Sequence, residues 1–225
     1  MEKIIISLGG SLIIPDSIDI DFLKDFRELI ISEVEKGRKF VIITGGGKIC
    51  RRYQDAGKEI KRMSEEDLDW LGIYTTRYNA EFMKILFGEL AEEKIILDPT
   101  IFFEFKKPIV LGGGYKPGNS SDLATVVIAK NIGVKRIINL SNIDFVYDSD
   151  PKLNKSAKRI EKISWAEYRK IIPKEWNPGL NSPFDPIASE TAEMEGIEVV
   201  IMNGKPIDNL RNCILGKKFN GTIIN

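Results

Sequence analysis

Histidine is absent from this chain of 225 residues. Its absence excludes Ser-His-Asp and Cys-His catalysis, and it excludes every zinc site that needs an imidazole ligand. Cysteine is scarce as well, because the chain holds only Cys50 and Cys213, too few for a disulfide framework at this length. We expect both thiols to be buried as small hydrophobic groups.

An excess of charge of either sign is also missing, because 33 Lys and Arg residues balance 33 Asp and Glu residues. A chain without a global basic surface is not expected to bind nucleic acid or an acidic membrane. No apolar run approaches the roughly 18–20 residues of a membrane span, and the N-terminus shows no small-residue cleavage site. We therefore expect a cytoplasmic protein with neither a membrane nor a nucleic acid as partner.

The sequence does contain a regular alternation of short β-branched runs and amphipathic stretches. Apolar runs predict strands at residues 4–8, 41–43, 95–97, 109–111, 137–140, 198–202 and 222–224. Helical spacing and capping patterns predict helices at 22–34, after the glycines at 45–47, at 64–87, after 119–122, after Ser164, from Asp185 to Gly196 and after Pro206. This alternation predicts an α/β fold, a three-layer αβα sandwich with a mainly parallel central sheet, in one domain spanning 1–225. The polar stretch 148–162 is expected to be a surface excursion within that domain.

Three glycine-rich loops follow predicted strands, at residues 9–11, 45–48 and 112–118. In an open α/β sheet, ligands bind outside the carboxyl ends of the strands, where glycines let backbone N–H groups approach phosphate oxygens. A single loop of this kind is often only a tight turn. Three in one chain predict several phosphates, which means a nucleotide together with a second phosphorylated or anionic ligand.

Two familiar nucleotide-binding motifs are missing from these loops. Gly47-Lys48 is followed by Ile49, and Val41 and Ile42 stand where the first glycine of a P-loop would be needed. The chain is therefore not a P-loop enzyme. No Gly-x-Gly-x-x-Gly follows the first predicted strand either, which disfavours a dinucleotide-binding fold.

Several longer strings occur in a fixed order along the chain. They read Leu8-Gly9-Gly10-Ser11, Gly45-Gly46-Gly47-Lys48 with Arg51, Asp69-Trp70-Leu71-Gly72-Ile73 with Thr76-Arg77-Tyr78-Asn79-Ala80, Gly112-Gly113 with Pro117-Gly118 and Ser120-Ser121-Asp122, Ser141-Asn142-Ile143-Asp144-Phe145-Val146-Tyr147 with Asp150-Pro151, Asp185-Pro186-Ile187-Ala188, and Asn220-Gly221-Thr222. In these strings the chain resembles the amino-acid kinase superfamily, and most closely the archaeal-type uridine monophosphate (UMP) kinases. The Ser-Asn-x-Asp-x-Val-Tyr string points to the superfamily, and the Asp-x-x-Gly-Ile and Thr-Arg-x-Asn-Ala strings point to UMP kinases within it.

The resemblance implies the amino-acid kinase fold, with an acceptor-binding half at about residues 1–120 and an ATP-binding half at about 121–225. It implies transfer of the γ-phosphoryl group of ATP to UMP with the help of Mg²⁺, so that small-molecule nucleotides are the expected partners. It also implies a homo-oligomer, a hexamer in related proteins, joined through the helix at 64–87.

The resemblance also assigns roles to individual residues. It implies catalytic roles for Arg51, Asp122 and Asp144, and it assigns no side chain as a metal ligand. ATP would contact Ser7, Gly9, Gly10, Ser11, Gly47, Arg51, Ser141, Asn142, Tyr147 and Asp150, with Tyr147 against the adenine. UMP would contact Gly46, Asp69, Gly114, Tyr115, Lys116, Pro117, Gly118, Asn119, Ser120 and Ser121, with Asp69 accepting from the ribose hydroxyls.

Some positions depart from the family pattern. Ser7 stands where many superfamily kinases carry Lys, so the missing positive charge must come from Mg²⁺, Arg51 or Lys48. Phe145 stands where the pattern usually has Gly, and phenylalanine resists a positive φ. The loop 114–119 is one residue longer than the common form, and the segment 173–183, with Trp176, also diverges.

Other interpretations stay open beside this one. Arg51 would also suit a solvated helix face, Asp69 and Asp122 would suit the first turns of helices, and Asp185 would suit the N-cap before Pro186. Arg77 would suit an ion pair between helices or subunits. The whole chain would also suit a kinase for another small phosphate or carboxylate acceptor, or a non-catalytic nucleotide or oxyanion binder on the same scaffold.

Overall fold

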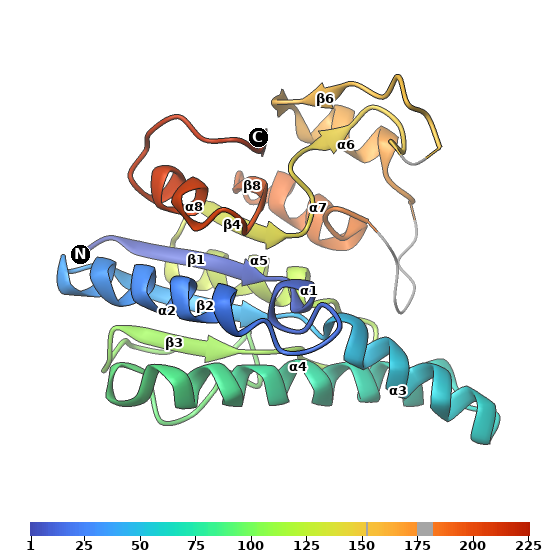
Figure 1. The fold of residues 1–225 in the computed structure, drawn as a ribbon, viewed down its shortest axis with the longest axis horizontal. Coiled ribbons are helices and arrows are strands. Elements are labelled where there is room, and N and C mark those ends of the chain that lie inside the picture. The colour runs from blue at the N-terminus through green and yellow to red at the C-terminus, as the bar shows by residue number, and fades with distance from the viewer. Residues whose placement is uncertain (152, 175–181) are drawn as a thin grey trace.

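A mainly parallel seven-stranded sheet forms the centre of the computed structural model, which describes residues 1–151, 153–174 and 182–225 (Figure 1). The strand order is β3-β2-β1-β4-β8-β9-β7, and neighbouring strands pair in parallel except for β8 with β9. The strands are β1 Lys3–Leu8, β2 Lys39–Thr44, β3 Ile109–Gly112, β4 Arg136–Ser141, β7 Lys162–Ile163, β8 Glu198–Asn203 and β9 Thr222–Ile224. The predicted α/β sandwich with a mainly parallel sheet is thereby confirmed.

Helices cover both faces of this sheet. They are α1 Gly10–Ile13, α2 Ile20–Glu35, α3 Gly47–Ile60, α4 Glu65–Phe87, α5 Ser121–Ile132, α6 Trp165–Ile171, α7 Pro186–Met194 and α8 Ile207–Ile214, with a 3₁₀ turn η1 at Gly88–Leu90. In Figure 1, α2 lies in front of the strands and α5 lies behind them. No helix in the described part of the chain is long and apolar enough to cross a membrane.

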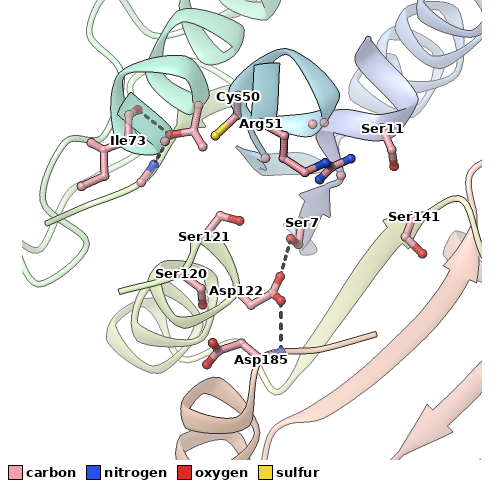
Figure 2. A pocket seen from close by; sticks show the side chains of 18 of the residues that line it. Ser7, Ser11, Cys50, Arg51, Ile73, Ser120, Ser121, Asp122, Ser141 and Asp185 are labelled. Atoms are coloured by element: carbon pink, nitrogen blue, oxygen red, sulfur yellow. Dashed lines mark hydrogen bonds between the residues drawn. The ribbon is translucent and has the colours of Figure 1, made fainter. Parts of the chain in front are cut away.

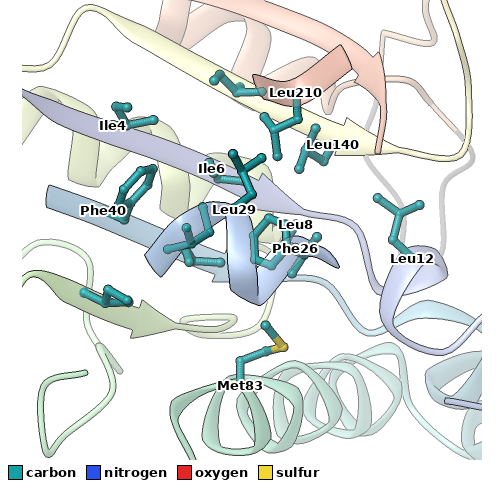
Figure 3. Packing of buried hydrophobic residues seen from close by; sticks show 14 of the residues in the cluster. Ile4, Ile6, Leu8, Leu12, Phe26, Leu29, Phe40, Met83, Leu140 and Leu210 are labelled. Atoms are coloured by element: carbon teal, nitrogen blue, oxygen red, sulfur yellow. The ribbon is translucent and has the colours of Figure 1, made fainter. Parts of the chain in front are cut away.

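The alternation of side chains along the strands creates two separate hydrophobic cores. On β1, Ile4, Ile6 and Leu8 pack with α2, α4 and α8 on one face of the sheet, as Figure 3 shows. Ile5 points to the opposite face and packs with α5, α6 and α7. Because successive side chains of a strand point to opposite faces, Ser7 must lie on the same side as Ile5, toward α5.

The predicted helix boundaries hold where capping chemistry defined them. The Ser64 side chain accepts from the backbone N–H of Asp67 at 3.0 Å, and the two residues form a capping box at the start of α4. Ser164 with Glu167 forms a second capping box, and Asp185 caps α7 by accepting from Ala188 N–H at 2.6 Å. The helix predicted at 22–34 is α2, and it stops before Gly37, whose φ is +90°.

The predicted strand at 95–97 is wrong. Ile96 makes one isolated parallel bridge to Gly112, and no strand forms around it. The apolar run is only three residues long, and Asp98 ends it by accepting from the backbone N–H of Thr100 at 2.9 Å in a turn through Pro99.

The polar stretch 148–162 returns to the body of the protein through a small hairpin. Its strand β6, Arg159–Ile160, pairs antiparallel with β5, Val146–Tyr147. Most of the described residues between these strands are exposed, as expected for a surface excursion. Most of the divergent segment 173–183 lies outside the described residues, Trp176 included.

Candidate active site

A cavity of about 310 Å³ opens at the carboxyl ends of β1, β2 and β4 (Figure 2). The chain lays β2 and then β3 on one side of β1 and later places β4 on the other side, so the strand order reverses next to β1. Ligands of open α/β sheets bind at this kind of reversal, outside the carboxyl ends of the strands. The fold therefore places the first two glycine-rich loops at its expected binding crevice.

Those two glycine loops are packed directly against each other. A β carbon on Gly10 would lie 2.6 Å from the carbonyl oxygen of Gly45, and one on Gly47 would lie 2.5 Å from the carbonyl oxygen of Gly10. Gly47 also has a φ of +67°, which disfavours any residue with a β carbon. The glycines are thus required by backbone packing, and this packing brings the loops after β1 and β2 to one wall of the cavity.

A short chain of polar contacts crosses the floor of the cavity. The Ser7 hydroxyl donates to Asp122 Oδ1 at 3.1 Å, and the backbone N–H of Asp185 donates to Asp122 Oδ2 at 3.2 Å. Asp122 lies in the first turn of α5, where Ser120 is the N-cap. Ser7, one of the positions that depart from the pattern of the resemblance, thus presents a hydroxyl that is turned toward a carboxylate.

The two carboxyl groups on this floor are held in a desolvated setting. Burial, followed by the charge of Asp185, raises the pKa of Asp122 to about 7. Burial also raises the pKa of Asp185, whose side chain caps α7 through Oδ1. Its Oδ2 atom is buried and has no hydrogen-bond partner among the described residues. The N-cap role expected for Asp185 is confirmed, and this second oxygen remains free to bind a ligand.

Arg51 is the one basic side chain that the described part of the chain contributes to the cavity lining. It lies on α3, one turn after the second glycine loop, and Figure 2 shows its guanidinium at the cavity near Ser7. No described residue forms an ion pair with it. Lys48, the other candidate for the missing positive charge, is bound to Asp16 at 2.9 Å and does not line the cavity.

The third glycine loop is held along one face of α4. Asp69 Oδ2 accepts from the backbone N–H of Gly118 at 2.7 Å, and Thr76 Oγ1 accepts from that of Gly114 at 2.7 Å. Burial is the larger influence on Asp69 and raises the pKa of its carboxyl, whereas the bond from Gly118 works in the opposite direction. Because only Oδ2 is used by Gly118, Oδ1 stays available to a ligand such as a ribose hydroxyl.

Within the described residues Arg77 does not form the ion pair between helices that we considered for it, whereas an ion pair between subunits stays a prediction. Its Nε donates to the carbonyl oxygen of Gly114 at 3.1 Å, and its Nη2 donates to that of Tyr115 at 2.7 Å. Within the described residues no carboxylate pairs with it, so the guanidinium serves backbone carbonyls instead.

The residues predicted for ATP divide into two groups. Ser7, Gly9, Gly10, Ser11, Gly47 and Ser141 line the cavity with Arg51. Asn142, Tyr147 and Asp150 lie outside the cavity lining, on the segment that follows β4 and includes β5. Asp144, for which a catalytic role was predicted, lies on the same segment and does not line the cavity either. Asp144 is exposed and accepts from Asn203 Nδ2 at 2.9 Å.

Phe145 is accommodated by the turn after β4. It is buried, and no residue other than glycine has a positive φ in the described part of the chain. The Arg159 guanidinium lies 5.1 Å from the centre of its ring. The turn thus takes a shape that a large side chain adopts without strain.

The residues predicted for UMP divide in the same way. Gly46, Asp69, Gly114, Asn119, Ser120 and Ser121 line the cavity, as do Asp122 and Arg51. Tyr115, Lys116, Pro117 and Gly118 form the outer part of the loop and do not line it. The Lys116 ammonium lies 5.1 Å from the centre of the Tyr115 ring.

Sequence reasoning missed several lining residues that helical spacing would have found. Cys50 and Gln54 follow Gly46 at intervals of four residues, and Gly72, Ile73 and Thr76 follow Asp69 at three, four and seven. Cys213 is buried as expected, but Cys50 is only half-buried because it faces the cavity. The other missed lining residues are Gly45, Asn139, Ser182, Pro183 and Asp185.

The completed cavity has the chemistry of a phosphate site with a polar anchor at one end. Backbone amides and Arg51 supply positive potential, and the hydroxyls of Ser7, Ser11, Ser121 and Ser141 supply hydrogen bonds. Asp69, Asp122 and Asp185 supply three carboxyl groups against one guanidinium. Within the described residues these three carboxyl groups do not lie together as a group that could hold a metal ion by themselves.

Comparison with known proteins agrees with these observations. The sequence model of the amino acid kinase family matches residues 2–203. The uridylate kinase of Methanocorpusculum labreanum is 33% identical over 230 residues, covering 100% of this chain and 96% of that protein. The uridylate kinase of Thermoplasma acidophilum is 32% identical over 231 residues, covering 99% and 96%.

Solved structures show the same arrangement of elements. The crystal structure of uridylate kinase from Archaeoglobus fulgidus has a TM-score of 0.81 and 28% identity to this chain, and the match covers 100% of both chains. The UMP kinase from Bacillus anthracis has a TM-score of 0.77 at 23% identity, which shows a shared fold. Since the sequence match runs from the start of β1 to the end of β8 and the fold agrees over the whole chain, the protein belongs to the amino acid kinase family.

Proposed function

We propose that this protein is a UMP kinase, which transfers the γ-phosphoryl group of ATP to UMP and releases ADP and UDP. The observation that carries the proposal is the joining of Arg51, Asp69 and the three glycine loops around one cavity. Uridylate kinases that match along almost the whole chain support the same substrate pair. The cytoplasm, where both nucleotides occur, is the compartment that we propose for it.

The reaction itself asks for little covalent help from the protein. A phosphate oxygen of UMP forms a bond to the γ-phosphorus of ATP, and the bond from that phosphorus to the β–γ bridging oxygen breaks. The attacking oxygen is already anionic, so no histidine base is needed. Catalysis then rests on alignment and on neutralising charge. Arg51 is placed to bind phosphate oxygens with two N–H groups, and the amides of the loops after β1 and β2 add fixed donors.

Asp69 and the loop from Gly114 to Ser121 would define the acceptor end. Asp69 Oδ1 would accept from a ribose hydroxyl, because Oδ2 is already used by Gly118. The half of the chain after about residue 121 would bind ATP, with Ser141 at the phosphates and Tyr147 against the adenine. Asp144 and Asp150 would act at the same end.

Mg²⁺ fits the acidic floor of the cavity. The buried, unpartnered Oδ2 of Asp185 is an oxygen ligand of the kind that Mg²⁺ prefers, and the Asp122 carboxylate accepts from the backbone N–H of the same residue. Among the described residues no three carboxylates or thiols lie close enough together to hold a metal ion by themselves, so nucleotide phosphates and water would complete the coordination. When bound, the ion would neutralise phosphate charge that Arg51 alone does not balance.

An assay with purified protein tests this function. ATP, Mg²⁺ and each of UMP, CMP, AMP and GMP are incubated with the protein, and ADP release is measured. We expect turnover with UMP well above that with the other monophosphates. The absence of ADP release with UMP, from protein that binds ATP in a calorimeter, would reject a UMP kinase and leave a kinase for another acceptor or a non-catalytic binder.

A homo-oligomer is part of the same proposal, and it would form through α4. Tyr74, Tyr78 and Ile85 lie on this helix with 60%, 76% and 71% of their surface exposed, and Trp70 stacks on Tyr74. A second copy would cover this apolar stripe by a self-complementary contact. Light scattering should show a mass of at least two chains, and Tyr78→Glu should lower it. A monomeric mass for the unchanged protein would contradict this.

A further inference from the structure

Arg77 lies on the long helix α4, and its side chain forms hydrogen bonds to the backbone of the third glycine loop. Two nitrogens of its guanidinium donate to the carbonyl oxygens of Gly114 and Tyr115, at 3.1 and 2.7 Å. Nη2 also reaches the carbonyl oxygen of Leu97 at 3.5 Å. One side chain thus ties together the loop and the segment that precedes β3.

The same loop is anchored to α4 at two further points. Asp69, about two helical turns before Arg77, accepts from Gly118, and Thr76 accepts from Gly114. Gly113 packs so tightly on the helix that a β carbon there would lie 2.9 Å from the backbone nitrogen of Arg77. The helix therefore shapes the loop, and Arg77 is its only anchor on the loop's carbonyl groups within the described residues.

The consequence for the cavity follows from the residues that this loop carries. Gly114 lines the cavity directly, and the loop leads to Asn119, Ser120 and Ser121, which line it as well. Without Arg77, the carbonyls of Gly114 and Tyr115 would turn toward water. The loop would then be held to α4 only by its hydrogen bonds to Thr76 and Asp69. Asp69 would then have to hold a mobile Gly118 and bind its ligand at the same time.

We propose that Arg77 is a positioning residue of the acceptor subsite, which fixes the loop 114–118 in the shape that receives the nucleoside monophosphate. This inference rests on the proposed UMP kinase function. Arg77 does not line the cavity and contacts no reacting group, so its effect passes through the loop. Lys is a poor substitute, since one ammonium on a flexible stem does not present the planar fork that meets two carbonyls.

Steady-state kinetics of Arg77→Ala and Arg77→Lys test the proposal. Because two strong hydrogen bonds to the loop are lost, we expect the KM for UMP to rise by about tenfold or more in Arg77→Ala. The KM for ATP should stay within about twofold, since the loops after β1 and β2 do not touch Arg77. Arg77→Lys should fall between Arg77→Ala and the unchanged enzyme.

Arg27→Ala is a matched control for the loss of an arginine that binds a carbonyl. Arg27 Nε donates to the carbonyl oxygen of Leu86 at 2.6 Å, at the far end of α4 and away from the cavity. If Arg77 were important only for stability, both variants would lower the melting temperature and leave both KM values unchanged. Calorimetric titration with UMP alone gives a second readout that needs no turnover, and it should show weaker binding in Arg77→Ala and unchanged binding in Arg27→Ala.

The outcomes separate this inference from the proposed function. If the unchanged protein does not phosphorylate or bind UMP, the function fails. If it does both and Arg77→Ala keeps the KM and affinity for UMP, the function stands and the role of Arg77 is rejected. A rise in the KM for ATP equal to that for UMP would also reject it, because the effect would then be general.

Discussion

A β carbon added to Gly10 would lie 2.2 Å from the backbone nitrogen of Gly47, so the loops after β1 and β2 fit together only as bare backbone. We expect Gly10→Ala to separate the loops, to lower the free energy of unfolding by about 1–3 kcal/mol and to abolish most activity. Gly72→Ala is the control, since the nearest atom to its β carbon would be 3.6 Å away and Gly72 lies within α4. Urea denaturation should show it equal to or more stable than the unchanged protein by up to about 1 kcal/mol. Equal stability of Gly10→Ala would contradict the packing.

Arg51 is expected to carry most of the positive charge that the protein brings to the phosphates. Arg51→Ala should lower kcat/KM for UMP by about 10²–10³, because a preorganised cation in a partly desolvated site is lost. Lys48→Ala is a matched control, since Lys48 is the nearby cation that pairs with Asp16 outside the cavity. It should change kcat/KM by less than about threefold. Equal losses in the two variants would mean that the charge is spread over the helix.

The stability of the nucleotide-free protein should depend on the protonation of Asp122. Its pKa is raised to about 7 by burial and by the charge of Asp185, from about 3.9 in the unfolded chain. A carboxyl with a raised pKa binds its proton more tightly when folded. Its contribution to stability is therefore complete below about pH 4 and is lost as the pH rises through about 7.

Asp122→Asn removes this dependence on pH. Urea denaturation in a chelating buffer at about pH 5 and about pH 8 should show a smaller loss of stability in the variant than in the unchanged protein. The pKa of Asp185 is also raised by burial, so part of the dependence should remain in the variant. Parallel curves for the two proteins would show that Asp122 is already ionised at low pH.

A substitution of Tyr147 tests the proposed ATP-binding end of the site, since Tyr147 does not line the cavity. If its ring lies against the adenine, Tyr147→Ala should raise the KM for ATP by about threefold to tenfold, and Tyr147→Phe should keep it close to normal. The KM for UMP should be unchanged in both. A rise in the KM for UMP alone would place Tyr147 at the wrong end of the site.

Glu33 is a buried carboxylate far from the cavity, at the end of α2. Burial by itself works to raise the pKa of Glu33, but the hydrogen bonds and charges of Lys36 and Arg38 outweigh it and lower the pKa. Glu33→Ala should cost about 1–3 kcal/mol, because Arg38 loses a partner and a cavity opens. The exposed Glu35→Ala should change stability by less than about 0.5 kcal/mol.

The contribution of Glu33 to stability depends on pH with the opposite sign to that of Asp122. A carboxyl with a lowered pKa stabilises the fold above its unfolded pKa of about 4.3, and this contribution is lost as the pH falls. Denaturation of the unchanged protein and of Glu33→Ala should therefore converge toward low pH. A gap that is constant with pH would assign the effect to packing alone.

The sheet and most helices were predictable because local chemistry defines them. Runs such as 4–8 and 198–202 are apolar at nearly every position, as strands covered on both faces must be. Ser64, Ser164 and Asp185 are N-cap residues that indicate where helices begin. The run 95–97 obeyed the same apolar rule and failed, because an Asp-Pro turn follows it directly.

The sequence predicts a phosphate-binding site at one edge of the sheet, but it does not predict most of the contacts within that site. Glycine loops after strands indicate a binding edge, but the packing of Gly10 on Gly47 depends on two strands that pair only in the folded sheet. The bond from Ser7 to Asp122 joins residues 115 apart in sequence, so no local pattern contains it. Among the described residues Arg77 has no charged partner that a charge pattern in the sequence would indicate, since its acceptors are backbone carbonyls.

The position of β1 at the centre of the sheet has a consequence for how the chain folds. Ile5 pairs with Val41 on one side and with Ile137 on the other, so one edge of this apolar strand has no partner until more than half of the chain is made. Long-range parallel pairing is slow, and an open apolar edge favours aggregation while it lasts. Refolding from denaturant should therefore be slow and should lose yield as protein concentration rises, with the closure of β4 onto β1 as the step that ends the exposure.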